Sequence, residues 1–182
     1  MRSAIDNGVA YATEDRKVYG LNLMDTIRGN TSLASLKALS RFGVIDETQE
    51  KKVAEKYRTE FRTKAPTIEM PRATSPEATS RRSCLRSGGH QSKVLILDEP
   101  TRGIDVGAKY DIYEIIDQLA DAGSAVIVVS SELPELLGIC DRIYTMCNGT
   151  ITANVDAKST NQEELMRYMT AEVPIDPSKV YA

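Results

Sequence analysis

The stretch Val94-Leu95-Ile96-Leu97-Asp98-Glu99-Pro100 decides the fold, because four large apolar residues are followed at once by two carboxylates and a proline. A short apolar run of this kind predicts a strand that is buried on both faces of a parallel sheet. In such sheets ligands bind beyond the carboxyl ends of the strands. The sequence therefore places Asp98 and Glu99 where a nucleotide phosphate and its Mg²⁺ can bind.

The two carboxylates suit two different roles at such a site. Asp98 would hold the hard cation, directly or through water. Glu99 would orient or deprotonate the attacking water, since phosphoryl transfer depends mostly on positioning and electrostatics. The alternative is a buried strand that meets solvent at an acidic turn, and the run up to Glu99 does not by itself separate the two interpretations.

The residues that follow make the motif specific. Residues 95–109 read LILDEPTRGIDVGAK, which resembles the Walker B motif and D-loop of ATP-binding cassette (ABC) ATPases. Within that superfamily the stretch is similar to the second cassette of the double-cassette ATPases that power monosaccharide import, of the xylose, galactose or multiple-sugar type. YATEDRK at residues 11–17 and SSELPE at residues 130–135 match further motifs of that group, and the resemblance covers roughly residues 1–72 and 93–171.

The resemblance implies an α/β fold: a partial P-loop NTPase domain of the ABC cassette type, with a mostly parallel sheet and helices. The chain contains no GxxxxGK[ST] sequence, so the Walker A loop that cradles phosphates is absent from it. We expect three parts: a helical-subdomain part in residues 1–72, an aberrant segment in residues 73–92, and the Walker B and D-loop core with a carboxy-terminal hairpin and helix in residues 93–182. We therefore expect an amino-terminally truncated fragment of a longer ATPase.

The aberrant segment carries its own signal. Residues 74–87 read TSPEATSRRSCLRS, where the family has the signature stretch LSGGNQQKVVLAKW. For one choice of codons, displacing the family stretch by one base yields residues 75–87 letter for letter, and the codon of Thr74 takes bases from before the stretch. We infer a frameshift that enters near Arg72 and is corrected near Ser92; the alternative is a natural Ser/Arg-rich linker.

The resemblance also implies roles for single residues. Asp98 binds Mg²⁺, Asp98 and Glu99 face the nucleotide, and Glu99 is the catalytic carboxylate. Asp105 is the D-loop aspartate, which meets the opposite cassette; a helix N-cap is the alternative, and both can hold. Ser131 occupies the position where many cassettes place a switch histidine, and because a serine donates a hydrogen bond but carries no charge, we expect weak hydrolysis there.

The implied cofactors are ATP and Mg²⁺, and the implied partners are the permease membrane subunits, a partner ATP-binding cassette and, indirectly, an extracellular sugar-binding protein. The implied location is peripheral, on the cytoplasmic face of the cell membrane. A net charge of −3 weighs against a nucleic-acid partner. Without a Walker A loop we expect this chain alone to be inactive. Two alternatives stay open: a non-catalytic remnant or assembly piece unable to bind ATP, and an ABC-type ATPase outside transport.

Hydrophobic periodicity and turn signals predict the local structure. In the amino-terminal half the expected elements are a strand at 8–12, two helical patches in 23–40 with a break at Asn30-Thr31, a helix at 47–61 and a loop at 62–92. They are followed by a helix at 109–120 stopped by Gly123, a buried strand at 125–129, a hairpin at 142–155 turning at Asn148-Gly149, and a last helix through Met169 opened by a Thr160–Glu163 capping box. The helix at 109–120 is expected to face inward with Ile112, Ile115, Ile116 and Leu119.

Overall fold

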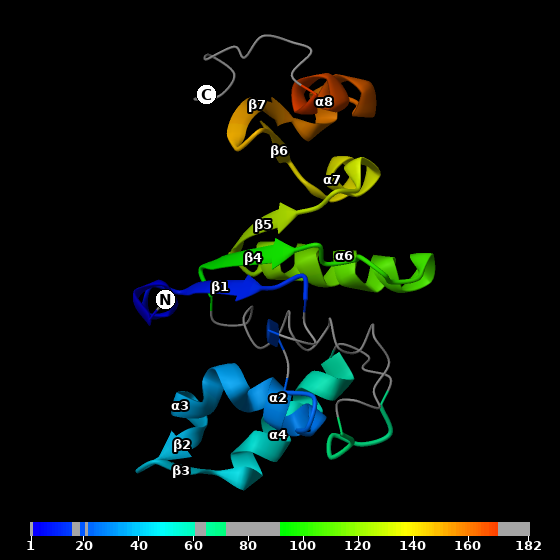
Figure 1. Ribbon diagram of the computed structural model, residues 1–182. Coiled ribbons are helices and arrows are strands. Elements are labelled where there is room, and N and C mark those ends of the chain that lie inside the picture. Colours follow the sequence, from blue (N-terminus) through cyan, green and yellow to red (C-terminus); the bar gives the residue numbers. More distant parts are fainter. Residues whose placement is uncertain (1, 16–18, 21, 61–64, 72–91, 171–182) are drawn as a thin grey trace. The chain divides into compact units, whose positions relative to one another are not determined.

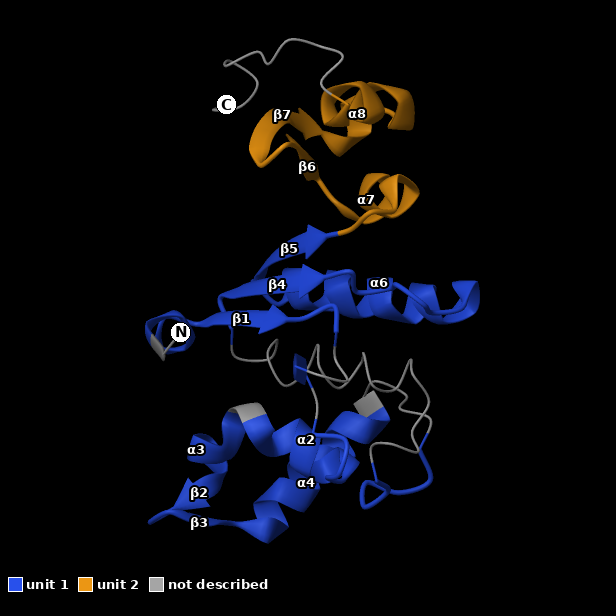
Figure 2. Ribbon diagram, in the orientation of Figure 1, with its two compact units in different colours: residues 1–129 blue, residues 130–182 orange. Residues whose placement is uncertain are grey.

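The computed structural model describes residues 2–15, 19–20, 22–60, 65–71 and 92–170. The chain divides into two compact units, residues 1–129 and residues 130–182 (Figure 2), and each is described by itself. This division follows spatial proximity, whereas the three-part division above follows motifs and stays a prediction. The segment inferred to be frameshifted lies, apart from Ser92, outside the described residues.

The first unit contains a three-stranded parallel sheet. It is built of β1 (Val9–Ala12), β4 (Val94–Asp98) and β5 (Ala125–Val129), in the order β1-β4-β5. The three arrowheads point the same way in Figure 1. Tyr11 pairs with Ile96 across one side of the central strand, and Asp98 pairs with Val129 across the other. The α/β fold with a parallel sheet is therefore confirmed.

The strands are not covered on both faces by the described residues. Leu95 and Leu97 are fully buried on one face of β4, whereas Val94 and Ile96 on the other face are half-buried. On β5, Ile127 and Val129 are 51% and 50% exposed. Within the described part of this unit, the expectation of strands buried on both faces is thus wrong for one face.

Helix α6 (Val106–Asp121) runs along the sheet (Figure 1). Its predicted inward stripe is confirmed, because Ile112, Ile115, Ile116 and Leu119 are all buried. The helix begins at Val106 because Asp105 caps it: the Asp105 carboxylate accepts a hydrogen bond from the Ala108 N–H at 3.0 Å. Past its end, Gly123 has φ +94°, the left-handed conformation expected of a helix stop.

The remaining elements of the first unit are mainly helical. They are α1 (Arg2–Asp6), α2 (Ile27–Ser32), the 3₁₀ helix η2 (Leu33–Ser35), α3 (Leu36–Leu39), the short antiparallel pair β2 (Ser40–Arg41) and β3 (Val44–Ile45), and α4 (Glu47–Glu60). The predicted helix at 47–61 is confirmed as far as Glu60, and Phe61 lies outside the described residues.

The predicted break at Asn30-Thr31 is wrong, because α2 continues through both residues. Asn30 is buried, and its side-chain amide donates to the carbonyl oxygens of Thr26 at 2.9 Å and Asn22 at 2.8 Å. The Asn30 N–H also donates to the Thr26 carbonyl at 3.1 Å, so the side-chain bond to that carbonyl does not interrupt the helix. The change to a 3₁₀ turn comes at Leu33 instead.

A buried polar cluster joins α2 to α4. Glu50, on the charged side of α4, is only 7% exposed and accepts a hydrogen bond from the Ser32 hydroxyl at 2.5 Å. The Arg28 Nε lies 3.3 Å from the same carboxylate. Residues 65–71 of the predicted loop also contact α2, since the Arg28 N–H donates to the Ile68 carbonyl at 3.0 Å. These contacts, with buried Ala54, hold the helical part together.

The second unit contains α7 (Leu133–Ile139), the hairpin of β6 (Arg142–Cys147) and β7 (Thr150–Asp156), the 3₁₀ helix η4 (Ala157–Ser159) and α8 (Gln162–Met169). Its core is formed by Ile143, Ala157 and Leu165. The predicted hairpin is confirmed, and its turn residues Asn148 and Gly149 both have positive φ, as a two-residue turn of this kind requires.

The predicted capping box is one residue out of place. Asn161, not Thr160, caps α8, and its side-chain oxygen accepts from the Glu164 N–H at 3.0 Å. Asparagine is at least as good an N-cap as threonine. The Thr160 hydroxyl donates instead to the Glu164 carboxylate at 3.0 Å. Across the described segments of the chain, no helix has the length and apolar character needed to cross a membrane.

Candidate functional site

The two predicted carboxylates lie where the central strand ends. Asp98 is the last residue of β4, and the N–H of Glu99 donates to the Val129 carbonyl at 2.8 Å, which continues the ladder one residue further. Glu99 has φ +46°, a left-handed conformation that is uncommon for a residue with a side chain. The chain then turns, since the Arg102 N–H donates to the Glu99 carbonyl at 3.3 Å.

Tyr11 contacts the candidate metal ligand directly. Its hydroxyl donates a hydrogen bond to Oδ2 of Asp98 at 2.7 Å. This hydrogen bond, together with partial desolvation and the charge of Asp98, raises the pKa of Tyr11 above its ordinary value. The phenol therefore stays protonated at neutral pH and remains a donor to the carboxylate.

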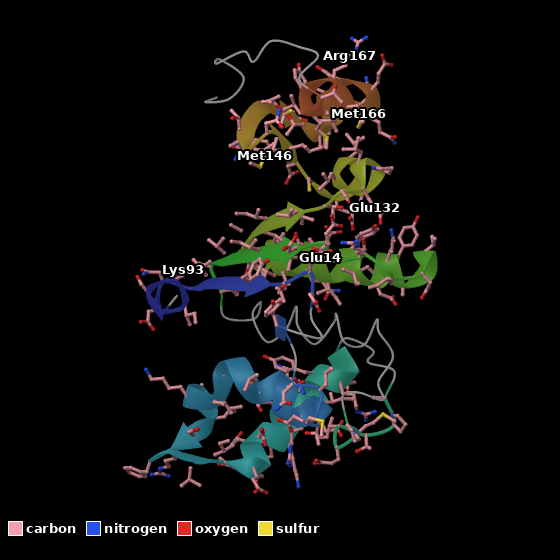
Figure 3. All side chains as sticks on the ribbon, in the orientation of Figure 1. Glu14, Lys93, Glu132, Met146, Met166 and Arg167 are labelled. Atoms are coloured by element: carbon pink, nitrogen blue, oxygen red, sulfur yellow. The ribbon has the colours of Figure 1, made fainter. Side chains whose placement is uncertain are left out.

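A second contact joins the same two loops. Glu14, labelled in Figure 3, lies in the loop after β1 and forms an ion pair with Arg102, which follows β4. The two side chains are 44% and 66% exposed, so solvent screens the pair and its contribution to stability is small. Its effect is to place a positive charge and a further carboxylate at the same edge of the sheet as Asp98.

The other two predicted site residues have different local settings. Asp105 caps α6, so the helix-cap alternative is realised, and its side chain is exposed. Ser131 is exposed and belongs to the second unit. The residues around it are held by Ser130, whose hydroxyl donates to the buried Glu135 at 2.5 Å and accepts from the Glu132 N–H at 3.0 Å.

The donor chemistry at Asp98 and Glu99 fits Mg²⁺. Among the residues that the structure describes, no group of three or more His, Cys, Asp or Glu could hold a metal ion by itself. Mg²⁺ does not need such a cage, because it keeps several waters and is usually bound through one or two carboxylates together with phosphate oxygens. Two adjacent carboxylates at the end of a parallel strand satisfy that requirement.

Sequence reasoning had assigned no role to Tyr11. The residue does open the YATEDRK stretch, and alternation along β1 places it on the face shared with Ile96 and Asp98. Its contact with Asp98 spans 87 positions of the chain, however, and only the strand pairing reveals it.

Known proteins similar in sequence are ATP-binding proteins of sugar transport. L-arabinose transport ATP-binding protein AraG of Geobacillus stearothermophilus is 50% identical over 179 residues, covering 92% of this chain and 33% of that protein. Xylose import ATP-binding protein XylG of Geobacillus kaustophilus is 44% identical over 92% of this chain and 33% of its own length. Ribose import ATP-binding protein RbsA of Corynebacterium glutamicum is 41% identical over 93% of this chain and 33% of its own length.

The chain thus spans about a third of the length of the curated relatives it matches. Among solved structures, CbiO1 from Clostridium perfringens, part of the ABC transporter complex CbiONQ, is similar with a TM-score of 0.70. It is 16% identical, and the match covers 90% of this chain and 63% of that chain, so it shows the fold. No protein family model matches the chain.

Proposed function

We propose that this chain is part of the ATP-binding subunit that couples ATP hydrolysis to monosaccharide import by an ABC transporter. The observation that carries the proposal is the 41–50% identity to arabinose, xylose and ribose transport ATP-binding proteins over more than nine-tenths of the chain. The carboxylate pair at the end of the central strand adds a chemical reason, since it suits Mg²⁺ and an attacking water.

In this proposal Asp98 holds Mg²⁺ directly or through water, and bound Mg²⁺ supplies positive charge against the phosphates of ATP. Glu99 orients or deprotonates the attacking water. Asp105 faces a partner cassette and also caps α6. The two roles are compatible because the Ala108 N–H occupies only one of the two carboxylate oxygens. Ser131 takes the sequence position where many cassettes have a switch histidine, and its neutral hydroxyl makes hydrolysis weak.

The proposed partners are permease membrane subunits, a second cassette and, through the permease, an extracellular sugar-binding protein. The proposed place is the cytoplasmic face of the membrane, with the subunit bound peripherally. A second candidate is a non-catalytic remnant or assembly piece unable to bind ATP. The third, an ABC-type ATPase outside transport, is disfavoured by the sugar-transport relatives.

A replacement experiment tests the proposal. The matching third of the L-arabinose transport protein is exchanged for this chain, and arabinose uptake and ATP hydrolysis are measured in proteoliposomes that contain the permease. A second exchange carries LSGGNQQKVVLAKW in place of residues 74–87, and a third adds Glu99→Gln to the second. We expect little uptake from the first and clear uptake from the second, and we expect the third to lose the share of ATP hydrolysis that this site contributes.

Each outcome has a distinct meaning. If the second exchange assembles with the permease but neither hydrolyses ATP nor transports arabinose, the transport proposal is wrong. If the first already transports arabinose at the rate of the relative, the inferred frameshift has no functional consequence and the remnant alternative falls. If Glu99→Gln leaves hydrolysis intact, Glu99 is not the catalytic carboxylate.

A further inference from the structure

The strand register explains how a tyrosine reaches the candidate metal ligand. Tyr11 pairs with Ile96, two residues before Asp98, and alternation places the side chains of Tyr11, Ile96 and Asp98 on one face of the sheet. Asp98 is therefore a diagonal neighbour of Tyr11 on the adjacent strand, a separation that aromatic and other long side chains can bridge. The 2.7 Å bond from the hydroxyl to Oδ2 shows that the bridge is made.

The backbone after Asp98 is anchored close to this bond, and a solvent-screened charge pair joins the same two loops. The Glu99 N–H is held by the Val129 carbonyl, so the backbone directly after Asp98 is anchored to β5. The Glu14–Arg102 ion pair ties the loop after β1 to the loop after β4. Tyr11 is thus the side chain that links the two strands at the carboxylate itself.

We propose that Tyr11 is a positioning residue for Asp98, whose carboxylate it orients by occupying Oδ2, leaving Oδ1 for a divalent cation. This inference rests on the proposed function, because it takes Asp98 as a Mg²⁺ ligand. A carboxylate attached by two rotatable bonds loses entropy when it binds a cation. A hydrogen bond that fixes it beforehand lowers that cost, which is why partners of metal ligands affect metal affinity.

The test uses the full chain with Mn²⁺ as a paramagnetic substitute for Mg²⁺, and free Mn²⁺ is counted by electron paramagnetic resonance up to millimolar concentration. We expect Tyr11→Phe to weaken Mn²⁺ binding by about fivefold, below the usual range for such partners because the bond is exposed to solvent. Asp98→Asn should abolish the same binding. Tyr144→Phe is the matched control, since it removes an exposed tyrosine hydroxyl in the second unit and keeps the ring that Arg142 contacts.

A second readout tests whether the cation binds beside Tyr11, and the urea midpoint shows whether the variant still folds. The chain contains no tryptophan, so Tb³⁺ luminescence excited through the protein reports a cation close to a tyrosine. Wild-type chain should show this emission, Tyr144→Phe should keep it, and Tyr11→Phe should lose it while its urea midpoint stays unchanged.

The outcomes are distinguishable. If Tyr11→Phe binds Mn²⁺ as tightly as wild type while Asp98→Asn does not bind it, the positioning role is wrong and the metal role of Asp98 stands. If Asp98→Asn binds Mn²⁺ like wild type, or wild type shows no binding at millimolar Mn²⁺, both the inference and the metal role fall. A shifted urea midpoint that accounts for the whole change in Mn²⁺ affinity would also overturn the inference.

Discussion

The left-handed backbone of Glu99 makes a quantitative prediction. At φ +46° a Cβ atom is crowded, and the left-handed region costs a residue with a side chain about 1–2 kcal/mol. Glycine avoids this cost, but its greater conformational freedom stabilises the unfolded chain by about 0.4–1 kcal/mol relative to alanine. Glu99→Gly should therefore stabilise the first unit by about 0.5–1 kcal/mol relative to Glu99→Ala, which removes the same side chain but keeps the Cβ.

Hydrogen exchange of the β4 amides, residues 94–98, measures this difference in the unit that carries Glu99. A gain of that size slows exchange through unfolding of the unit by about 2- to 5-fold. Gly103→Ala is the reverse control in the same loop, because Gly103 has φ +72° and an added Cβ would meet no atom within 4 Å. It should speed exchange, since only the backbone conformation opposes the substitution. Equal protection in Glu99→Gly and Glu99→Ala would refute the argument that this residue is strained.

Three further predictions concern nucleotide affinity and ionisation. Isothermal titration of the chain alone with Mg·ATP should show no measurable heat of binding, because Asp98 reaches phosphate only through Mg²⁺; micromolar affinity would contradict the expectation that this chain alone does not bind ATP. Because the pKa of Tyr11 is raised in the folded chain, its hydroxyl stabilises the fold at pH values below the unfolded pKa of about 10. This stabilisation is lost as the pH rises through the higher folded pKa. Urea unfolding should thus show wild type losing stability above about pH 10 more steeply than Tyr11→Phe, and parallel curves would count against the hydrogen bond to Asp98. Burial, with smaller contributions from Glu135 and Asp141, raises the pKa of the Cys140 thiol, so iodoacetamide should alkylate Cys140 more slowly in the folded chain than in urea at the same pH; equal rates would disprove this.

Local signals in the sequence predicted local structure well. The apolar run before Asp98 gave the central strand, the apolar period gave the buried stripe of α6, and Gly123 and Asn148-Gly149 marked a helix stop and a hairpin turn that the structure confirms. Two of the errors were also local. Asn30 was interpreted as a break, although its buried amide bonds within its own segment, and Asn161 competed with Thr160 for the same cap.

Contacts at the candidate site could not be predicted in the same way. The bond from Tyr11 to Asp98 and the ion pair from Glu14 to Arg102 each join β1 and its loop to β4 and its loop, which are far apart in the chain. No spacing rule relates such positions before the strand order is known. The left-handed conformation of Glu99 is likewise invisible in the sequence, because glycine or asparagine is the usual signal for positive φ and glutamate is not.

One face of the sheet is half-exposed among the described residues, although the composition of its strands is typical of a sheet covered on both faces. Ile96 and Ile127 lie side by side on that face, and Val129 follows on β5 next to Asp98. Parallel sheets are almost always covered on both faces, and that cover selects apolar residues at successive positions of a strand rather than at alternate ones. The strands at 94–98 and 125–129 carry that composition, yet in the described part of the first unit only the face of Leu95 and Leu97 is closed. The composition of these strands thus fits a sheet that is covered on both faces. Tyr11 and Asp98 lie on the face that the described residues leave half-exposed.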